Sequence, residues 1–529
     1  MVRLFSSRKF LFIAALGFIT VSAISVLLYS TPQGLGLSDD SIAYVAGARS
    51  ILSGQGYREA WLASNQPVTH FPPGFSTILA LIGLSGLDPL RGTRFLNSIL
   101  FGANAFLLGI IGWRMIKSQT AGVMLAALFA VNVSLFNTHA VAMSEPLYIF
   151  FSLAAFLTFS EYFSLSSVLT GRGQGQGWLI VTGILAAFAY LTRYAGLALI
   201  ATFLFAIILL HDTWKKRLIS AAIFIASAAP FLLGWSIRNK IVADNATNRT
   251  LIWHPLTLEN INTGIYNLSG FFVPVEMWRR AFVKIPSLFA FILSIITLSL
   301  LVWIVTTGLK KFLQPSTRLP EILSFTNGLY VFGYMASIIS SMLLFDASTK
   351  FKLRILSPVY VSLLILLVYI GSWLWQKRTI FWRSLVVVIA LLVFTISIYA
   401  TSNTVTMLHK GGLGYASFQW YDSEAMTFLR SLPKDTRVYT NQPGPVYLYA
   451  DRPSYVLPDL LDPVTDLPRE GYAEGVVALH NDVSSGNAVL ALFKFGAESD
   501  DIQTIYLQLS QGLYLAHDSR GNKIYSAYP

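Results

Sequence analysis

Two adjacent carboxylates, Asp39 and Asp40, open the stretch "SDDSIAYVAGARSILSGQGY" (38–57), which follows an apolar run. A carboxylate beside a membrane surface can act as a general base, because poor solvation raises its pKa. Two adjacent acids can instead hold a divalent cation. The structural alternative is a helix start, in which Ser38 is the N-cap and the helix dipole favours acids in the first turn. The pair is therefore a candidate for catalysis, for metal binding or for helix capping.

The motif "THFPPGFS" (69–76) places an imidazole, His70, before two prolines. An imidazole there can bond a phosphate or an acceptor hydroxyl, although a single histidine is often only a surface residue. Proline fits the first position of a helix, so the motif predicts a helix that starts at the prolines.

Arg193 lies inside a long apolar segment, 178–210. An ionisable residue in such a segment is costly and is by default a functional candidate. The alternative is an arginine that extends its charged end to the membrane interface.

A second group of cations, Lys350, Lys352 and Arg354, lies in "FDASTKFKLRILSPVY" (345–360). The donor fork of arginine suits phosphate recognition. The segment therefore predicts a site for an anionic substrate group, with an ordinary solvated loop as the alternative.

Glu145, in "NTHAVAMSEP" (137–146), is either an acid that supports a neighbouring site residue or a helix-start carboxylate. Carboxylates, an imidazole and cations thus gather on one predicted membrane face, at the depth of a lipid phosphate. A transporter more often has polar residues and broken helices at mid-membrane, and the predicted spans are nearly free of polar residues. The pattern favours chemistry on a lipid-linked substrate.

The elements that must position these residues are membrane helices. The chain has 529 residues and is 54% hydrophobic and 12% charged, which is about half the charged fraction of soluble domains. The first apolar run follows Arg3, Arg8 and Lys9, and we interpret it as an uncleaved span with an inside N-terminus rather than a signal peptide. By run length we expect about eleven spans, at 10–29, 94–116, 120–138, 145–163, 178–193, 194–210, 218–237, 286–309, 321–345, 355–375 and 380–400.

Two interpretations fix the topology. Phe71–Leu87 is short for a span, so we expect a helix at the membrane interface. Segment 178–210 would be about 50 Å long as one helix, against a hydrocarbon core of about 30 Å, so we expect two helices that meet near Arg193. Basic residues then lie in short inner loops: Arg114, Lys117, Arg172, Lys215, Lys216, Arg217, Lys310, Lys311, Arg318, Lys377, Arg378 and Arg383. The C-terminal part then lies outside, whereas a spanning Phe71–Leu87 would place it in the cytoplasm.

The expected fold is a polytopic α-helical membrane protein with a small C-terminal α/β domain. The membrane domain covers 1–400, with the acids in its first outer loop (30–93), and the extracytoplasmic domain covers 401–529. In the latter, "DSEAMTFLRSLP" predicts a helix, whereas "RVYT", "SYVLP" and "IYLQL" predict strands.

The charge is distributed unevenly along the chain. Residues 401–529 carry 9 Lys/Arg and 14 Asp/Glu, whereas residues 1–400 carry 29 and 12. The net charge of +12 therefore belongs to the membrane part, where short loops and anionic lipids explain it, and does not indicate nucleic-acid binding. The chain has no Cys, which excludes disulfides and thiolate metal sites.

The sequence resembles the C-type (GT-C) membrane glycosyltransferases, in the branch with protein O-mannosyltransferases and lipid A aminoarabinose (ArnT-like) transferases. Four stretches carry the resemblance in the family's order: the acidic pair with its helix and glycine turn (38–57), "HFPPGFSTILALIGLSG", "GILAAFAYLTRYAGLALI" and "KFKLRILSPVYVSLLILL". The ordered set covers the membrane part. "LRSLPKDTRVYTNQPGPVYLYADRPSYVLP" is similar to the soluble tail of bacterial relatives.

The resemblance implies transfer of a hexosyl or pentosyl group, with inversion, from a polyprenyl phosphate to an acceptor at the outer face of the bacterial plasma membrane. It implies that Asp39 is the catalytic carboxylate residue of the first loop, beside Asp40. It also implies that Arg193 and Arg354 lie near the donor phosphate. His70 stands where relatives often have Lys, and a neutral imidazole binds phosphate less strongly.

Two further functions are weighed against this expectation. A transporter or flippase of lipid-linked saccharides is the alternative, and a membrane scaffold with an outer binding domain is the third interpretation. No cofactor follows with certainty; the one candidate is a divalent cation at the acidic pair.

The topology generates a first prediction. A reporter fused after residue 529 should be active when it requires export and inactive when it requires the cytoplasm, because about eleven spans from an inside N-terminus leave the C-terminus outside. The two reporter types on the same fusion provide the control. Activity of the cytoplasmic reporter alone would contradict the prediction and would mean that Phe71–Leu87 spans.

Overall fold

The structure, a computed structural model, describes residues 7–168, 174–243, 251–283, 286–377, 379–462 and 464–528. It consists of two compact units, each made of three stretches of chain. Unit 1 comprises Met1–Thr31, His70–Phe75 and Arg94–His409, and unit 2 comprises Pro32–Thr69, Ser76–Thr93 and Lys410–Pro529. Arg172 and Arg378, expected at the inner face, lie outside the described residues.

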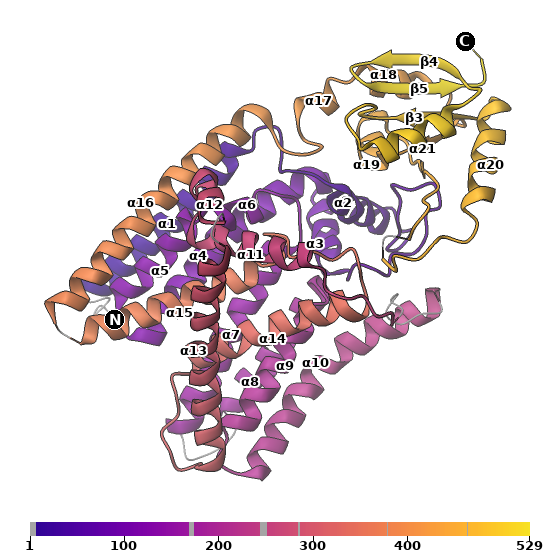
Figure 1. Ribbon diagram of the computed structural model, residues 1–529. Helices are drawn as coiled ribbons and strands as arrows, with labels where there is room; N and C mark the ends of the chain where they lie inside the picture. The colour runs from indigo at the N-terminus through magenta and orange to yellow at the C-terminus, as the bar shows by residue number, and fades with distance from the viewer. Residues whose placement is uncertain are drawn as a thin grey trace. The chain divides into compact units, whose positions relative to one another are not determined.

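Unit 1 is built from long apolar helices, which Figure 1 labels. The helices that provide it, with a few residues of α4 and α16 belonging to unit 2, are α1 (Ser7–Ser30), α4 (Pro89–Ile116), α5 (Gln119–Val131), α6 (Val133–His139), α7 (Glu145–Val168), α8 (Gln174–Thr192), α9 (Gly196–Leu210), α10 (Trp214–Ala243), α11 (Leu258–Phe272), α12 (Glu276–Val283), α13 (Pro286–Leu313), α14 (Ile322–Leu344), α15 (Ser357–Gln376) and α16 (Ile380–Gly411).

The polytopic prediction is confirmed. Among the described residues, nine helices are long and apolar enough to cross a membrane, and ten if α5 and α6, bent by 65°, form one span. The remaining expected span corresponds to α9, whose 15 residues extend about 22 Å, less than the hydrocarbon core of about 30 Å. The expected count of about eleven is therefore approximate. Helix α16 also continues to Gly411, past the expected domain boundary at residue 400.

The predicted break near Arg193 is confirmed. Helix α8 ends at Thr192 and α9 begins at Gly196. The Gly196 N–H donates to the Arg193 carbonyl at 2.8 Å. A Cβ at Gly196 would lie 2.4 Å from the Tyr190 backbone nitrogen, so only glycine permits this tight reversal.

The spans contain more buried polar residues than the sequence predicted. Asn104 of α4 lies 3.1 Å from His139 Nε2 of α6 and donates to the Pro146 carbonyl at 3.1 Å. In α14 and α15, Ser362 donates to Asn327 at 3.0 Å. Window hydropathy averages such residues with their apolar neighbours, which is why the pairs are hidden in the sequence.

Helix α3 (Gly74–Gly83) follows His70 and contains 10 residues, a length of about 15 Å. It starts after the prolines and not at them, because Pro73 restricts Pro72 to an extended conformation. A Cβ at Gly74 would lie 2.7 Å from the Leu191 carbonyl oxygen. The backbone of segment His70–Phe75 therefore packs directly on the end of α8, two residues before Arg193.

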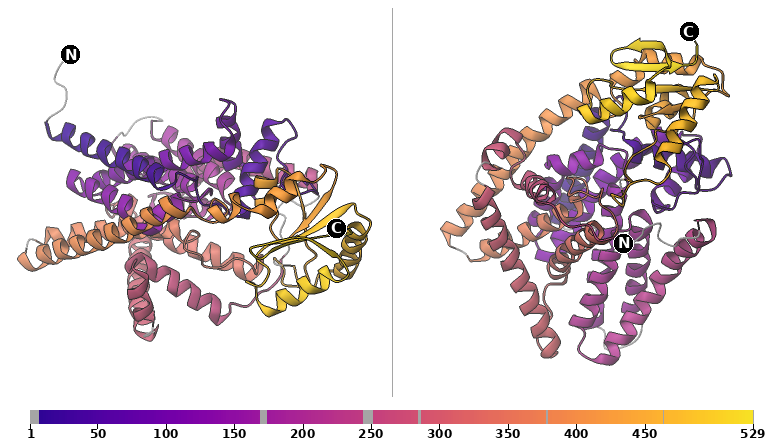
Figure 2. Two further views of the ribbon diagram at one scale, coloured as in Figure 1. Left: turned by 90° about the horizontal axis from the view of Figure 1, so that it is seen from above. Right: turned by 45° about the vertical axis from the view of Figure 1, so that its right-hand side comes forward.

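Unit 2 contains helix α2 (Asp39–Leu52), most of α3 and a C-terminal α/β domain, the yellow end of the chain in Figure 2. Its five strands lie in the order β2-β1-β3-β5-β4, with β2, β1 and β3 parallel and β5 and β4 antiparallel. The elements of this domain are α17 (Phe418–Tyr421), α18 (Glu424–Ser431), β1 (Arg437–Thr440), α19 (Pro443–Pro445), the π-helical turn η1 (Val446–Ala450), β2 (Tyr455–Val456), α20 (Tyr472–Ser484), β3 (Ala488–Leu492), α21 (Asp500–Ser510), β4 (Tyr514–Ser519) and β5 (Asn522–Ser526).

The central strand β3 is buried on both faces. Val489 and Ala491 enter one hydrophobic core, whereas Leu490 and Leu492 enter the other. Since successive side chains of a strand point to opposite faces, helices cover both sides of this sheet. The α/β prediction is confirmed, as are the strands at "RVYT" and "SYVLP" and the helix at "DSEAMTFLRSLP".

The strand predicted at "IYLQL" is wrong, because these residues belong to α21. Tyr506 and Leu509 are buried in this helix, and Ile505 packs against the same core. With Ile502, these apolar residues follow helical spacing over the whole segment. A window of five residues reads only the local apolar run and misses this period.

The first loop and the C-terminal domain are joined in unit 2 by backbone pairing. Leu37 pairs with Gly414, and the Ala63 N–H donates to the Ser454 carbonyl at 3.0 Å. The Arg49 guanidinium of α2 lies 5.6 Å from the ring centroid of Tyr447 in η1. The unit that carries the acidic pair is therefore built from the first loop together with the C-terminal part of the chain.

Candidate active site

A buried carboxylate in unit 1 holds two of the predicted arginines. Glu145 Oε1 lies 2.7 Å from Arg193 Nη1 and 3.7 Å from Arg354 Nη1. The Glu145 side chain is 1% exposed, against 18% and 29% for the two arginines. Three residues that the sequence singled out therefore come together, although they are far apart along the chain.

The charges of this cluster determine which ligands it suits. A buried carboxylate is stable only with close cationic partners. Here two guanidinium groups meet one carboxylate, and the two arginine side chains are partly open to solvent. Arginine donors in such a place suit a phosphate or a carboxylate ligand.

The three members of the cluster come from three turns. Glu145 is the first residue of α7, and Arg193 lies in the turn between α8 and α9. Arg354 lies three residues before α15. The Ser144 hydroxyl accepts a hydrogen bond from Arg193 at 3.3 Å.

Buried tyrosines fix the two arginine-bearing turns, and the sequence did not reveal them. The Tyr148 hydroxyl donates to the Ala195 carbonyl at 3.3 Å and lies 2.6 Å from the Tyr330 hydroxyl. The Tyr334 hydroxyl donates to the Ile355 carbonyl, one residue after Arg354, at 2.8 Å. The available signal was spacing: Tyr330 and Tyr334 stand four apart on α14, which places them on one helix face.

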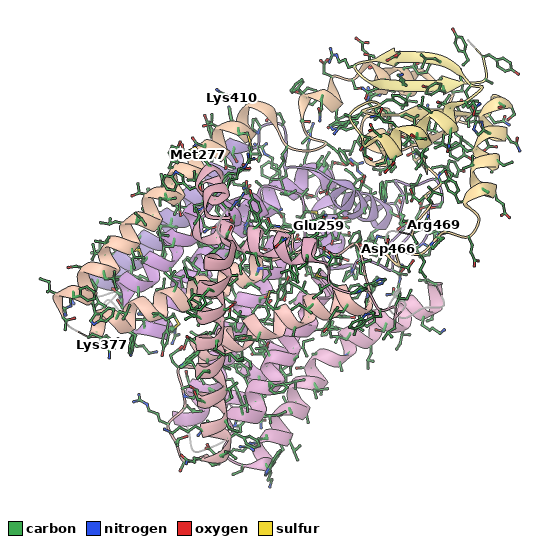
Figure 3. All side chains as sticks on the ribbon, in the orientation of Figure 1. Glu259, Met277, Lys377, Lys410, Asp466 and Arg469 are labelled. Atoms are coloured by element: carbon green, nitrogen blue, oxygen red, sulfur yellow. The ribbon has the colours of Figure 1, made fainter. Side chains whose placement is uncertain are left out.

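The other predicted cations and His70 occupy different surroundings. Lys350 is about half exposed, and its Nζ lies 3.7 Å from Oε1 of Glu259, which Figure 3 labels on α11. Lys352 is exposed. His70 is half-buried, and its ring centroid lies 4.3 Å from that of Phe71. Both lysines are thus more exposed to solvent than the two arginines of the cluster.

Asp39 and Asp40 are the first two residues of α2, as the capping hypothesis predicted. Ser38 precedes them, and its N–H donates to the Ser41 hydroxyl at 3.2 Å. Capping by Ser38 and Ser41 therefore accounts for the helix start.

The Asp39 carboxyl is accessible to solvent, yet the surrounding protein removes part of its hydration. This desolvation, together with the charge of Asp40, raises the pKa of Asp39, and hydrogen bonds from the Tyr415 hydroxyl and the Gly444 amide act in the opposite direction. A carboxylate with a raised pKa is a better proton acceptor than an ordinary aspartate.

The metal hypothesis gains no cluster of protein ligands from the structure. Within the described ranges, no three His, Cys, Asp or Glu side chains gather in a way that could hold a metal ion. A cation at the acidic pair would need further ligands from a substrate, such as phosphate oxygens.

Solved structures have this architecture. ArnT from Cupriavidus metallidurans bound to undecaprenyl phosphate matches with a TM-score of 0.57 and 12% identity, over 99% of both chains. AglB from Archaeoglobus fulgidus, in complex with an inhibitory peptide and a dolichol-phosphate, matches with a TM-score of 0.55 and 14% identity, over 98% of this chain and 74% of that chain. The mycobacterial arabinofuranosyltransferase AftD matches with a TM-score of 0.53 and 13% identity, over 99% of this chain and 42% of that chain.

The fold is that of the GT-C membrane glycosyltransferases, which confirms the resemblance found in the sequence. Within the chain, residues 74–238 match the model of the dolichyl-phosphate-mannose-protein mannosyltransferase family. This matched segment contains Glu145 and Arg193. No curated protein matches the chain in sequence.

The buried cluster generates a prediction about stability. Glu145→Gln should lower the free energy of unfolding by about 3–5 kcal/mol, because it removes the buried carboxylate that pairs with both guanidinium groups. Thermal unfolding of the purified protein in detergent measures the effect as a lower midpoint.

Glu276→Gln is the matched control. Glu276 and Arg280 form an exposed pair on α12, 2.6 Å apart, and such pairs contribute at most about 1 kcal/mol. Equal midpoints for the two variants would show that Glu145 does not hold the cluster together.

Proposed function

We propose that this protein transfers a sugar from a polyprenyl-phosphate-linked donor to an acceptor hydroxyl, with inversion, at the outer face of a bacterial plasma membrane. The observation that carries the proposal is the pair of arginines that share one buried glutamate. The GT-C fold supports it, as do the apolar helices that make the chain an integral membrane protein.

Arg193 and Arg354 are proposed to bind the donor phosphate. Glu145 keeps both guanidinium groups close together, and both arginine side chains remain partly open to solvent. As the sugar leaves, negative charge grows on the phosphate, and preorganised donors stabilise this charge most when they need not move. The tyrosines beneath the two turns supply that rigidity.

Asp39 is proposed to be the general base. The acceptor oxygen attacks the anomeric carbon, its proton moves to Asp39, and the bond from the anomeric carbon to the phosphate oxygen breaks. Polyprenyl phosphate leaves with the electron pair of that bond. Asp40 adds negative charge beside Asp39, which helps to raise the pKa of the base.

A flippase of lipid-linked saccharides is the second candidate, and the bend of 65° between α5 and α6 favours it. Broken helices with buried polar groups are common in transporters, and His139 and Asn104 are such groups. Dependence of lipid movement on an ion gradient would support the flippase. Sugar transfer by purified protein in detergent, where no gradient exists, would support the glycosyltransferase.

The proposed base generates a prediction about rate. Asp39→Asn should lower turnover at least about 100-fold, the usual scale for a general base, with little change in donor binding. The measurement is single-turnover transfer from a polyprenyl-phosphate sugar, with Asp40→Asn as the control. A larger loss for Asp40→Asn would assign the base to Asp40, and rescue of both variants by added divalent cation would make the acids metal ligands.

The phosphate site generates a prediction about donor use. Arg193→Ala and Arg354→Ala should each lower kcat/KM for the donor by about 10- to 150-fold, the value of one charge-assisted contact in a partly dry site. Lysine should rescue only partly, because it keeps the charge and loses the fork.

The exposed lysines serve as controls for this experiment. Lys350→Ala and Lys352→Ala should cost less, and their effect should fall as salt rises. Wild-type donor kinetics in a folded Arg193→Ala protein would show that Arg193 only pairs with Glu145 and does not bind the donor phosphate.

A further inference from the structure

Backbone pairing places Tyr415 next to the acidic pair. The Leu37 N–H donates to the Leu413 carbonyl at 3.2 Å, and the Tyr415 N–H donates to the Leu37 carbonyl at 3.0 Å. Between these bonds Gly414 has a φ of +58°, and a Cβ there would lie 2.1 Å from the Leu37 oxygen. Only glycine allows this approach. It places Tyr415 beside Leu37, two residues before Asp39.

The side chain of Tyr415 is held from several directions. Its ring packs edge-on against Trp420, and its carbonyl accepts from the Tyr449 hydroxyl at 2.6 Å. Its hydroxyl donates to Gln442 Oε1 at 3.1 Å and shares the same proton with the Asp39 carboxylate. Burial and the neighbouring Asp39 raise the pKa of Tyr415, so the hydroxyl keeps its proton and acts as a permanent donor.

Gly444 approaches the same carboxylate from another segment of the domain. A Cβ at Gly444 would lie 2.8 Å from Asp39 Oδ1 and 2.9 Å from Cε2 of Tyr415. The Gly444 amide also donates to Asp39. Gly444 lies four residues beyond the carboxyl end of β1, and that edge of an open α/β sheet is where ligands usually bind. Here a carboxylate of the first loop lies at this edge.

We propose that Tyr415 and Gly444 are positioning residues for Asp39, so that the C-terminal domain completes the catalytic base. This inference rests on the proposed function only in naming Asp39 as the base. The contacts that carry it lie within unit 2.

The hydrogen bonds also affect the proton affinity of the base. Within unit 2, the titratable groups that act on Asp39 are Asp40, which raises its pKa, and Tyr415, which lowers it. The basic form of Asp39 is lost as pH falls through its pKa. Removing the Tyr415 hydroxyl should therefore raise this pKa and move the acid limb of the activity profile to higher pH.

Tyr415→Phe and Gly444→Ala test the proposal in the full-length protein. Tyr415→Phe should lower turnover about tenfold, the value of one hydrogen bond to a charged group, and shift the acid limb upward. Gly444→Ala should lower turnover up to about 100-fold through misplacement of the carboxylate. The KM for the polyprenyl-phosphate donor should stay close to that of the wild type in both variants.

Two matched variants separate positioning from general damage. Tyr439→Phe removes a tyrosine hydroxyl on strand β1 of the same unit, one that donates to Asp482. Gly475→Ala adds a methyl group on α20, where the new Cβ would meet only Pro458 at an ordinary 3.4 Å. Both controls should keep wild-type turnover and pH dependence. If Gly444→Ala does not fold, the near-isosteric Tyr415→Phe decides alone.

A readout without activity separates this inference from the proposed function. A carbodiimide modifies the protonated carboxyl of Asp39, and mass spectrometry of the modified peptide across pH gives its pKa. The midpoint should lie higher in Tyr415→Phe than in wild type and be unchanged in Tyr439→Phe. An unchanged midpoint, or wild-type turnover and acid limb in both test variants, would overturn the proposal. Absence of any sugar transfer by wild type would overturn the proposed function alone.

Discussion

The ion pair between Glu145 and Arg193 is the interaction on which the arrangement of unit 1 depends. A carboxylate this deeply buried is tolerated only with a cation against it, so the start of α7 and the turn between α8 and α9 must meet. Arg354 joins the same carboxylate and brings in the segment before α15. The requirement for charge pairing thus brings three remote segments into one ionic cluster, and the hydrogen bonds of Tyr148 and Tyr334 hold two of these segments in place.

Unit 2 uses backbone contacts where unit 1 uses charge. Glycines at positions 414 and 444 allow main chain to come within contact of Leu37 and Asp39, and a larger residue at either place would collide with an oxygen atom. Electrostatics then act on a carboxylate whose position is already set. The two units therefore show two ways to hold a charged side chain, by pairing its charge and by packing backbone against it.

Local patterns in the sequence predicted what local physics determines. Hydrophobic run length identified the membrane helices, the 33-residue apolar segment (178–210) implied a break at Arg193, and Ser38 marked the start of α2. Pairings between remote segments could not be read in this way, because neither Glu145 nor Tyr415 carries a mark of its partner. The error at α21 has a local cause, since five residues are too few to separate a helical period from a strand. The glycines just before Tyr415 were the available sign that two backbones approach closely there.

The pairing of Leu37 with Gly414 also has a consequence for biosynthesis. A ribosome makes the first partner early and the second only near the end of translation, on the order of tens of seconds later at about 5–20 residues per second. During that interval the nascent first loop has none of its later contacts, and Asp39 lacks both Tyr415 and Gly444. The surroundings of Asp39 are therefore completed late, after the membrane helices have been synthesised.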